Sequence, residues 1–82
     1  MIEPIGTFCP VCGRDQGEEI THMMGDICPC CGIEYLDFFK EVFIAYRKEW
    51  IDSGYAWSSY YMRPPNWDPV EQMKHIPERF RE

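Results

Sequence analysis

Apolar side chains recur at three- and four-residue intervals between positions 37 and 54, and this spacing predicts an amphipathic helix over that range. Its apolar face consists of five side chains: Phe39, Val42, Phe43, Tyr46 and Trp50. The charged side chains lie largely on its other faces: Lys40, Glu41, Arg47, Lys48 and Glu49. Asp37 is placed to cap the first turn, and Gly54 is expected to end the helix because glycine readily adopts the left-handed conformation.

The apolar surface of this helix is wider than one stripe. Phe38, Ile44 and Ile51 add apolar side chains beside the main face. We therefore expect the helix either to be buried on two sides or to present one of those sides to a partner.

Residues 1–36 offer only short strand-like segments. Residues 5–8 and 33–35 have the composition of strands, and residues 20–24 favour a third strand that leads to Gly25 and Asp26. The polar segment 15–19 favours a turn or loop. We expect two ribbon-like hairpins from this arrangement.

The last third of the chain is aromatic and rich in proline. Residues 55–62 are irregular, and Pro64 and Pro65 favour an extended path. Asp68 followed by Pro69 predicts a short helix over 69–76, because aspartate caps a first turn and proline fits its first position. Residues 78–82 are expected to form a frayed tail.

The short length of the chain favours a cross-link that stabilises the fold. Its 82 residues, 45% of them hydrophobic, predict one small α+β domain spanning 1–82. The core of so short a chain barely offsets the conformational entropy lost on folding, so a disulfide, a metal or another cross-link is expected.

The cysteines form the strongest motif in the sequence. C-P-V-C-G at 9–13 and C-P-C-C-G at 28–32 are two copies of one pattern, and fifteen residues separate Cys12 from Cys28. A C-x-x-C-G segment folds as a knuckle, and two knuckles place four thiolates around one metal ion in a structural zinc site. The sequence therefore predicts a zinc ribbon with one zinc ion and four ligands: Cys9, Cys12, Cys28 and Cys31.

Four protein ligands leave no position for a reactive water, which argues against a metallohydrolase. The same four-thiolate geometry also suits iron, and rubredoxins carry a similar pair of knuckles, so a rubredoxin-like electron carrier is an alternative. The wider spacing of rubredoxin knuckles and the long aromatic helix of this chain disfavour it. The sequence also lacks a phosphate-binding loop and a recognisable catalytic order of serine, histidine and acid, so we do not expect an enzyme.

Cys30 and the two histidines stand outside the ligand set. Cys30 occupies the variable position of the second knuckle, where the first has Val11, and the simplest interpretation is a small packing residue. The alternative is a redox thiol that exchanges with a ligand and releases the metal, which would make the protein a thiol or zinc sensor. His22 and His75 are isolated and are interpreted as surface or packing residues.

The net charge of −6 is the opposite of the basic balance expected of a nucleic-acid-binding protein, so we do not expect nucleic acid as the partner. Residues 1–36 contain Arg14 as their only basic residue, against six acidic ones. This acidity serves solubility or attracts a positively charged partner. Residues 1–6 lack the features of a signal peptide, no segment has the length of a membrane span, and tightly paired cysteines suit a reducing compartment, so a cytoplasmic location is expected.

The aromatic residues that follow the helix have two interpretations. They either complete the core or form an exposed surface for a protein partner, since tryptophan, tyrosine and arginine are common anchors of interfaces. The residues proposed for partner binding are Trp57, Tyr60, Tyr61, Arg63 and Trp67.

Four segments of the chain resemble the small cysteine-rich CPCC proteins of bacteria and their phages. They are F-C-P-V-C-G at 8–13, I-C-P-C-C-G-I-E-Y at 27–35, R-K-E-W-I-D-S-G at 47–54 and P-P-N-W-D-P-V-E-Q-M at 64–73. The resemblance implies a cytoplasmic, zinc-ribbon-like protein and supplies no catalytic residues. The function expected from the sequence is a non-catalytic zinc-binding module that acts as adaptor or inhibitor of a partner protein.

Overall fold

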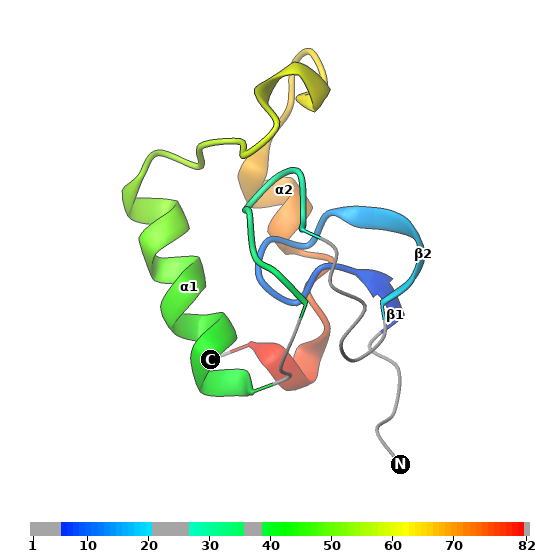
Figure 1. Ribbon diagram of the computed structural model, residues 1–82, viewed down its shortest axis with the longest axis vertical. Helices are drawn as coiled ribbons and strands as arrows, with labels where there is room; N and C mark the ends of the chain where they lie inside the picture. The colour runs from blue at the N-terminus through cyan, green and yellow to red at the C-terminus, as the bar shows by residue number, and fades with distance from the viewer. Residues whose placement is uncertain (1–5, 21–26, 36–38, 82) are drawn as a thin grey trace.

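The computed structural model describes residues 6–20, 27–35 and 39–81, and within them the chain is a small α+β structure. Strands β1 (Gly6–Phe8) and β2 (Asp15–Ile20) precede helix α1 (Lys40–Asp52). The 3₁₀ turn η1 (Tyr60–Met62) leads to helix α2 (Pro69–Met73), and a second 3₁₀ turn, η2 (Glu78–Phe80), follows. In Figure 1 the cysteine-bearing loops lie between α1 on one side and the strands on the other.

Strands β1 and β2 form an antiparallel hairpin around the first cysteine pair, with Phe8 opposite Asp15 and Gly6 opposite Ile20. The loop predicted at 15–19 is therefore wrong, because these residues belong to β2. The pairing of β1 with β2 shifts register between Gly6 and Phe8. Within β2, Gly17 adopts a positive φ of 79° and donates its backbone N–H to the Asp15 carboxylate at 2.9 Å. In the second ribbon, Ile27 and Glu34 form an isolated bridge. Of the strand predicted at 20–24, Ile20 alone lies within the described residues. The rest of that strand, and the turn predicted at Gly25 and Asp26, lie outside them.

Helix α1 is shorter than the predicted 37–54. Phe39 is its N-cap residue and makes no capping hydrogen bond through its side chain, whereas Asp37 and Phe38 lie outside the described residues. The prediction for Gly54 is confirmed: its φ is 86°, and its N–H donates to the carbonyl of Ile51. The next N–H, of Tyr55, donates to the carbonyl of Trp50 at 3.0 Å, which completes a Schellman motif.

The buried face of α1 differs from the predicted one. Phe43 and Trp50 are buried as expected, but Phe39 and Val42 are 58% and 48% exposed. Arg47, predicted on a polar face, is only 8% exposed and lies in line with Phe43 and Trp50. The helix thus turns a face with both apolar and charged side chains toward the cysteine-bearing loops, because Arg47 donates hydrogen bonds to the carbonyls of Pro10 and Val11 there.

Helix α2 begins where the sequence predicts. Asp68 accepts hydrogen bonds from the N–H groups of Val70 and Glu71, and Pro69 occupies the first turn. The helix is shorter than the predicted 69–76, because residues 74–76 continue it with the tighter i to i+3 hydrogen bonds of a 3₁₀ turn.

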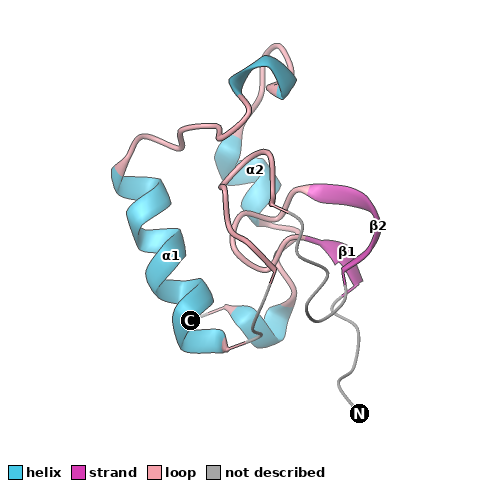
Figure 2. Cartoon of the chain, in the orientation of Figure 1, coloured by secondary structure: helices cyan, strands magenta, loops and turns pink. Residues whose placement is uncertain are grey.

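The tail predicted at 78–82 is wrong for its described part. Residues 78–80 form η2, and the ring of Phe80, 7% exposed, packs edge-on against Phe43 with centroids 5.2 Å apart. The end of the described chain therefore lies against the first half of α1, as Figure 2 shows.

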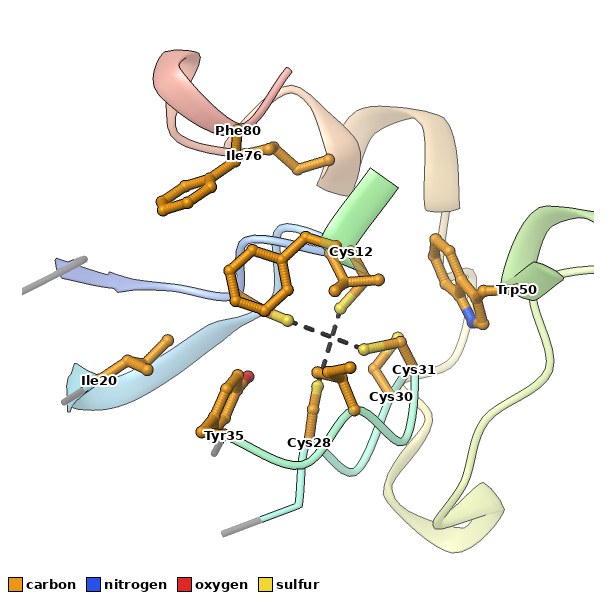
Figure 3. Packing of buried hydrophobic residues seen from close by; sticks show 13 residues of the cluster. Cys12, Ile20, Cys28, Cys30, Cys31, Tyr35, Trp50, Ile76 and Phe80 are labelled. Carbon is orange, nitrogen blue, oxygen red and sulfur yellow. Dashed lines mark hydrogen bonds between the residues drawn. The ribbon is translucent and has the colours of Figure 1, made fainter. Parts of the chain in front are cut away.

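The core is built around the cysteines. Five of its thirteen buried hydrophobic residues within the described chain are cysteines. Tyr35, Phe43 and Ile20 are its largest fully buried side chains, and Figure 3 shows Tyr35 beside the sulfur cluster. Tyr46, Tyr55, Trp57, Trp67 and Met73 pack on its outside.

Candidate metal centre

The two cysteine knuckles have the same backbone structure. In the first knuckle, the Cys9 N–H donates to the backbone carbonyl of Arg14 at 2.8 Å, and the Gly13 N–H donates to the backbone carbonyl of Cys9 at 2.9 Å. In the second knuckle the N–H of residue 28 donates to the carbonyl of residue 33, and the N–H of residue 32 donates to the carbonyl of residue 28. Both of these equivalent bonds are 2.9 Å long. The glycines have φ values of 83° and 84°, a conformation that side chains with a Cβ resist. The repeated motif in the sequence is therefore a repeated structure.

Each knuckle contributes two sulfurs to one cluster. The Cys9 sulfur lies 3.7 Å from that of Cys31, and the Cys12 sulfur lies 3.7 Å from that of Cys28. All four ligand atoms lie within 4.8 Å of one another, and Figure 3 shows the labelled sulfurs of Cys12, Cys28 and Cys31 pointing toward a common centre. A tetrahedral ion with metal–sulfur bonds of about 2.3 Å requires sulfurs roughly 3.8 Å apart. The four predicted ligands are thus placed to hold a metal ion.

The electrostatics of the cluster also favour a cation. Burial raises the pKa of the Cys12 and Cys31 thiols far above the ordinary range, whereas hydrogen bonds from the neighbouring thiols, first that of Cys12, lower the pKa of Cys28 far below it. Four buried thiolates so close together repel one another, and only a positive ion among them allows all four to be ionised. The charge of the thiolates and the spacing of the sulfurs therefore both favour a bound metal ion.

Two glutamine side chains donate hydrogen bonds to groups in or next to the cluster. The Gln16 side-chain N–H₂ donates to the Cys28 sulfur at 3.2 Å and to the hydroxyl of Tyr35 at 3.1 Å. The side chain of Gln72, on α2, donates to the carbonyl of Cys12 at 3.1 Å and to the Cys30 sulfur at 3.3 Å. Its own oxygen accepts from the Trp67 indole N–H at 2.8 Å. Both glutamines therefore orient groups in or next to the ligand set, as outer residues do in metal sites.

The carbonyl groups of the knuckles are covered by the rest of the chain. Arg47 donates to the carbonyls of Pro10 and Val11 at 2.6 and 2.7 Å, and also to that of Phe80 at 2.8 Å. In the second knuckle the equivalent carbonyls, of residues 29 and 30, accept from the backbone N–H groups of residues 59 and 58 at 2.8 and 3.0 Å. The buried Arg47 thus supplies the hydrogen-bond donors for the carbonyls of the first knuckle, and the backbone after α1 supplies them for the second knuckle.

Cys30 and His75 are placed as packing or surface residues. Cys30 is fully buried, as is Val11 at the equivalent position, and its predicted redox role stays a prediction. His75 is exposed and stacks on Phe8 with centroids 4.9 Å apart, whereas His22 lies outside the described residues.

The residues predicted for partner binding divide into two groups. Trp57 and Trp67 are half-buried against the core, with ring centroids 5.2 Å apart. Tyr60 and Tyr61, on η1, are 80% and 77% exposed and touch each other. Arg63 is exposed and lies over the Trp67 ring, 5.4 Å from its centroid. Both interpretations of the aromatic segment therefore hold, for different residues.

Sequence reasoning missed the roles of Gln16, Arg47 and Gln72. Gln72 lies 60 positions from the carbonyl that it contacts, and Arg47 lies 36 positions from one of its acceptors. The one signal near these residues in the sequence is the charge of Arg47, which lies on a helix face between the apolar Phe43 and Trp50. It can be recognised only when it is known which face of α1 is buried.

Comparisons of the chain with protein-family models, with curated proteins and with solved structures give no match. The resemblance to the CPCC family therefore stays a prediction. In the part of the chain that the structure describes, every helix lacks the length and hydrophobicity of a membrane span.

The two knuckle glycines provide a matched test of how α2 is held. We expect Gly32→Ala to destabilise the protein by about 1–2 kcal/mol, because alanine is strained at this positive φ. Gly13→Ala carries the same strain, and its Cβ would also overlap the backbone carbonyl of Gln72, whereas at Gly32 the nearest atom is the movable Tyr46 hydroxyl at 3.3 Å. Gly13→Ala should therefore cost at least about 1 kcal/mol more in urea denaturation of the metal-loaded proteins. Equal losses would contradict the docking of α2 on the first knuckle.

Proposed function

We propose that the protein is a zinc-binding interaction module without catalytic activity, which binds a partner protein as its adaptor or inhibitor. The observation that carries this proposal is the exposed Tyr60–Tyr61 pair on η1, in a chain whose four clustered cysteines would fill every ligand position of a tetrahedral metal ion. The zinc ribbon expected from the sequence is part of the same proposal, and a reducing cytoplasm is the compartment that would keep its thiols available.

The metal centre supports a structural role. Cys9, Cys12 and Cys28 are fully buried and Cys31 is 7% exposed, so the four ligands surround the ion and leave no open face for a substrate. Zinc is the usual occupant of such closed four-cysteine sites. Iron fits the same sulfur spacing, and an iron-bearing chain would instead be an electron carrier.

The aromatic pair supports partner binding. Turn η1, which carries Tyr60 and Tyr61, projects from the body of the molecule (Figure 1), and neighbouring Met62 is 44% exposed. Exposed tyrosines beside an arginine are the residue types that most often anchor protein interfaces. Burying two such rings would stabilise a complex substantially, since each aromatic side chain can remove up to about 200 Å² from water.

The test is a quantitative capture experiment with the metal-loaded protein and a Tyr60→Ser/Tyr61→Ser double variant. We expect a host protein to be retained by the unmodified chain and its retention to fall at least tenfold with the double variant. Both side chains are exposed, so circular dichroism and metal content should not change.

Phe39→Ser is the matched control. It also removes an exposed aromatic side chain, but at the N-terminal end of α1, remote from η1 (Figure 1). Retention of the same partner by all three proteins would contradict the proposed role of η1.

A further inference from the structure

A cleft of about 340 Å³ lies between the second knuckle and the last turns of α1. Residues 56–58, which follow the helix, also line it, and Cys31 and Gly32 form part of its wall. The volume is at the low end of the range for small-molecule sites, about 300–1,000 Å³. The cleft therefore has room for one side chain or a small ligand, not for a large cofactor.

Three of the nine residues that line this cleft are aromatic. Tyr46 and Trp57, both half-buried, line it together with Trp50. The faces of aromatic rings carry partial negative charge and attract cations, tryptophan most strongly. Such walls also suit the alkyl stem of a lysine or arginine side chain.

The residues that line the cleft carry charge of one sign. The cleft is lined by the acidic residue Glu49, which is exposed. Cys31, also in the wall, is a ligand of a centre whose four thiolates and divalent ion would leave a net charge of −2. The lining residues include no lysine, arginine or histidine, and the whole chain carries −6.

We propose that this cleft binds a lysine or arginine side chain of the partner protein. The stem of that side chain lies along the aromatic walls, and its charged end pairs with Glu49. The inference rests on the proposed function, since it names the chemistry of the partner, but it concerns a surface different from the Tyr60–Tyr61 pair and can be tested without the partner.

The test titrates the metal-loaded, ¹⁵N-labelled protein with three small probes and follows the Trp57 indole and Gly32 amide signals by NMR. N-acetyl-arginine amide and N-acetyl-lysine amide should shift these signals saturably, with Kd values of the order of 1 mM. The neutral N-acetyl-norleucine amide should bind at least about fivefold more weakly, because it lacks the cation–ring attraction.

A Glu49→Gln variant should bind both cationic probes about two- to fivefold more weakly, since an exposed ion pair is lost. Glu41→Gln is the matched control: it removes the same charge from the same helix, outside the cleft, and should bind as the unmodified protein does.

Equal affinity for norleucine and arginine probes, or unchanged binding by Glu49→Gln, would overturn the assignment of the cleft. Either result leaves the capture experiment with Tyr60→Ser/Tyr61→Ser unaffected. Conversely, cationic probes that bind the cleft while no partner depends on η1 would support the cleft and contradict the interaction surface proposed above.

Discussion

Removal of the metal ion is expected to unfold the protein. The four ligand sulfurs lie inside the core, and five of the thirteen buried hydrophobic residues of the described chain are cysteines of the two knuckles. Structural zinc sites contribute about 10–16 kcal/mol of apparent binding free energy, which equals or exceeds the whole stability of a typical small domain, about 5–15 kcal/mol. The chain without metal should therefore lose the circular dichroism of α1 and the shielded fluorescence of Trp50.

The measurement begins with the metal content and visible absorption of the purified protein, followed by chelation under reducing conditions. One colourless zinc ion per chain is expected, and iron with intense visible bands would favour the electron carrier instead. Addition of zinc to the stripped protein should restore the folded spectrum. A stripped protein that keeps its helical signal would contradict the structural role of the site.

Two cysteine variants separate the ligands from the remaining thiol. Cys28→Ser should behave as the stripped protein does, because it removes one ligand and the acceptor of the Gln16 hydrogen bond. Cys30→Val should stay folded and bind one metal ion, since valine already fills the equivalent position 11 of the first knuckle. Its loss of the Gln72 contact should cost no more than about 1 kcal/mol. Cys30→Val also tests the sensor hypothesis, which predicts slower oxidative release of the metal from this variant.

The parts of the structure predicted correctly are those that depend on neighbouring residues. A knuckle is closed by hydrogen bonds within six residues, so C-P-x-C-G specifies its own backbone and, through its repeat, the four ligands. The caps at Asp68 and Gly54 are equally local: each satisfies backbone groups two to four positions away. Such features can be read from the sequence because the chemistry and the spacing are both contained in it.

The incorrect predictions concern residues whose surroundings come from elsewhere in the chain. Phe80 is predicted to lie in a frayed tail, but in the structure its ring packs against Phe43, 37 positions earlier. The polar segment 15–19 gave no strand signal because only its partner, β1, makes it a strand. The aromatic segment after α1 could not be divided into core and surface, since Trp57 and Tyr60 differ in what packs on them and not in their local sequence.

Arg47 is the clearest such case, and its replacement is the second large effect that we expect. Arg47→Met keeps most of the buried volume but removes the donor to the carbonyls of Pro10, Val11 and Phe80. A buried carbonyl without a donor costs about 1–3 kcal/mol, and bonds to a charged donor are the stronger ones. We therefore expect a loss of about 3–5 kcal/mol, seen as a fall of roughly 15 °C or more in the Tm of the metal-loaded protein.

Two further variants decide whether the hydrogen bonds or the charge of Arg47 produce this effect. Lys48→Met removes a positive charge from the next position, on the exposed side of α1, and should change stability by no more than about 0.5 kcal/mol. Arg47→Lys keeps the charge but cannot reach all three carbonyls with the planar arrangement of a guanidinium group, so it should recover only part of the loss. Full recovery by lysine would mean that the charge alone matters. A small effect of Arg47→Met would mean that the first knuckle does not need the donor that the second receives from the backbone of residues 58 and 59.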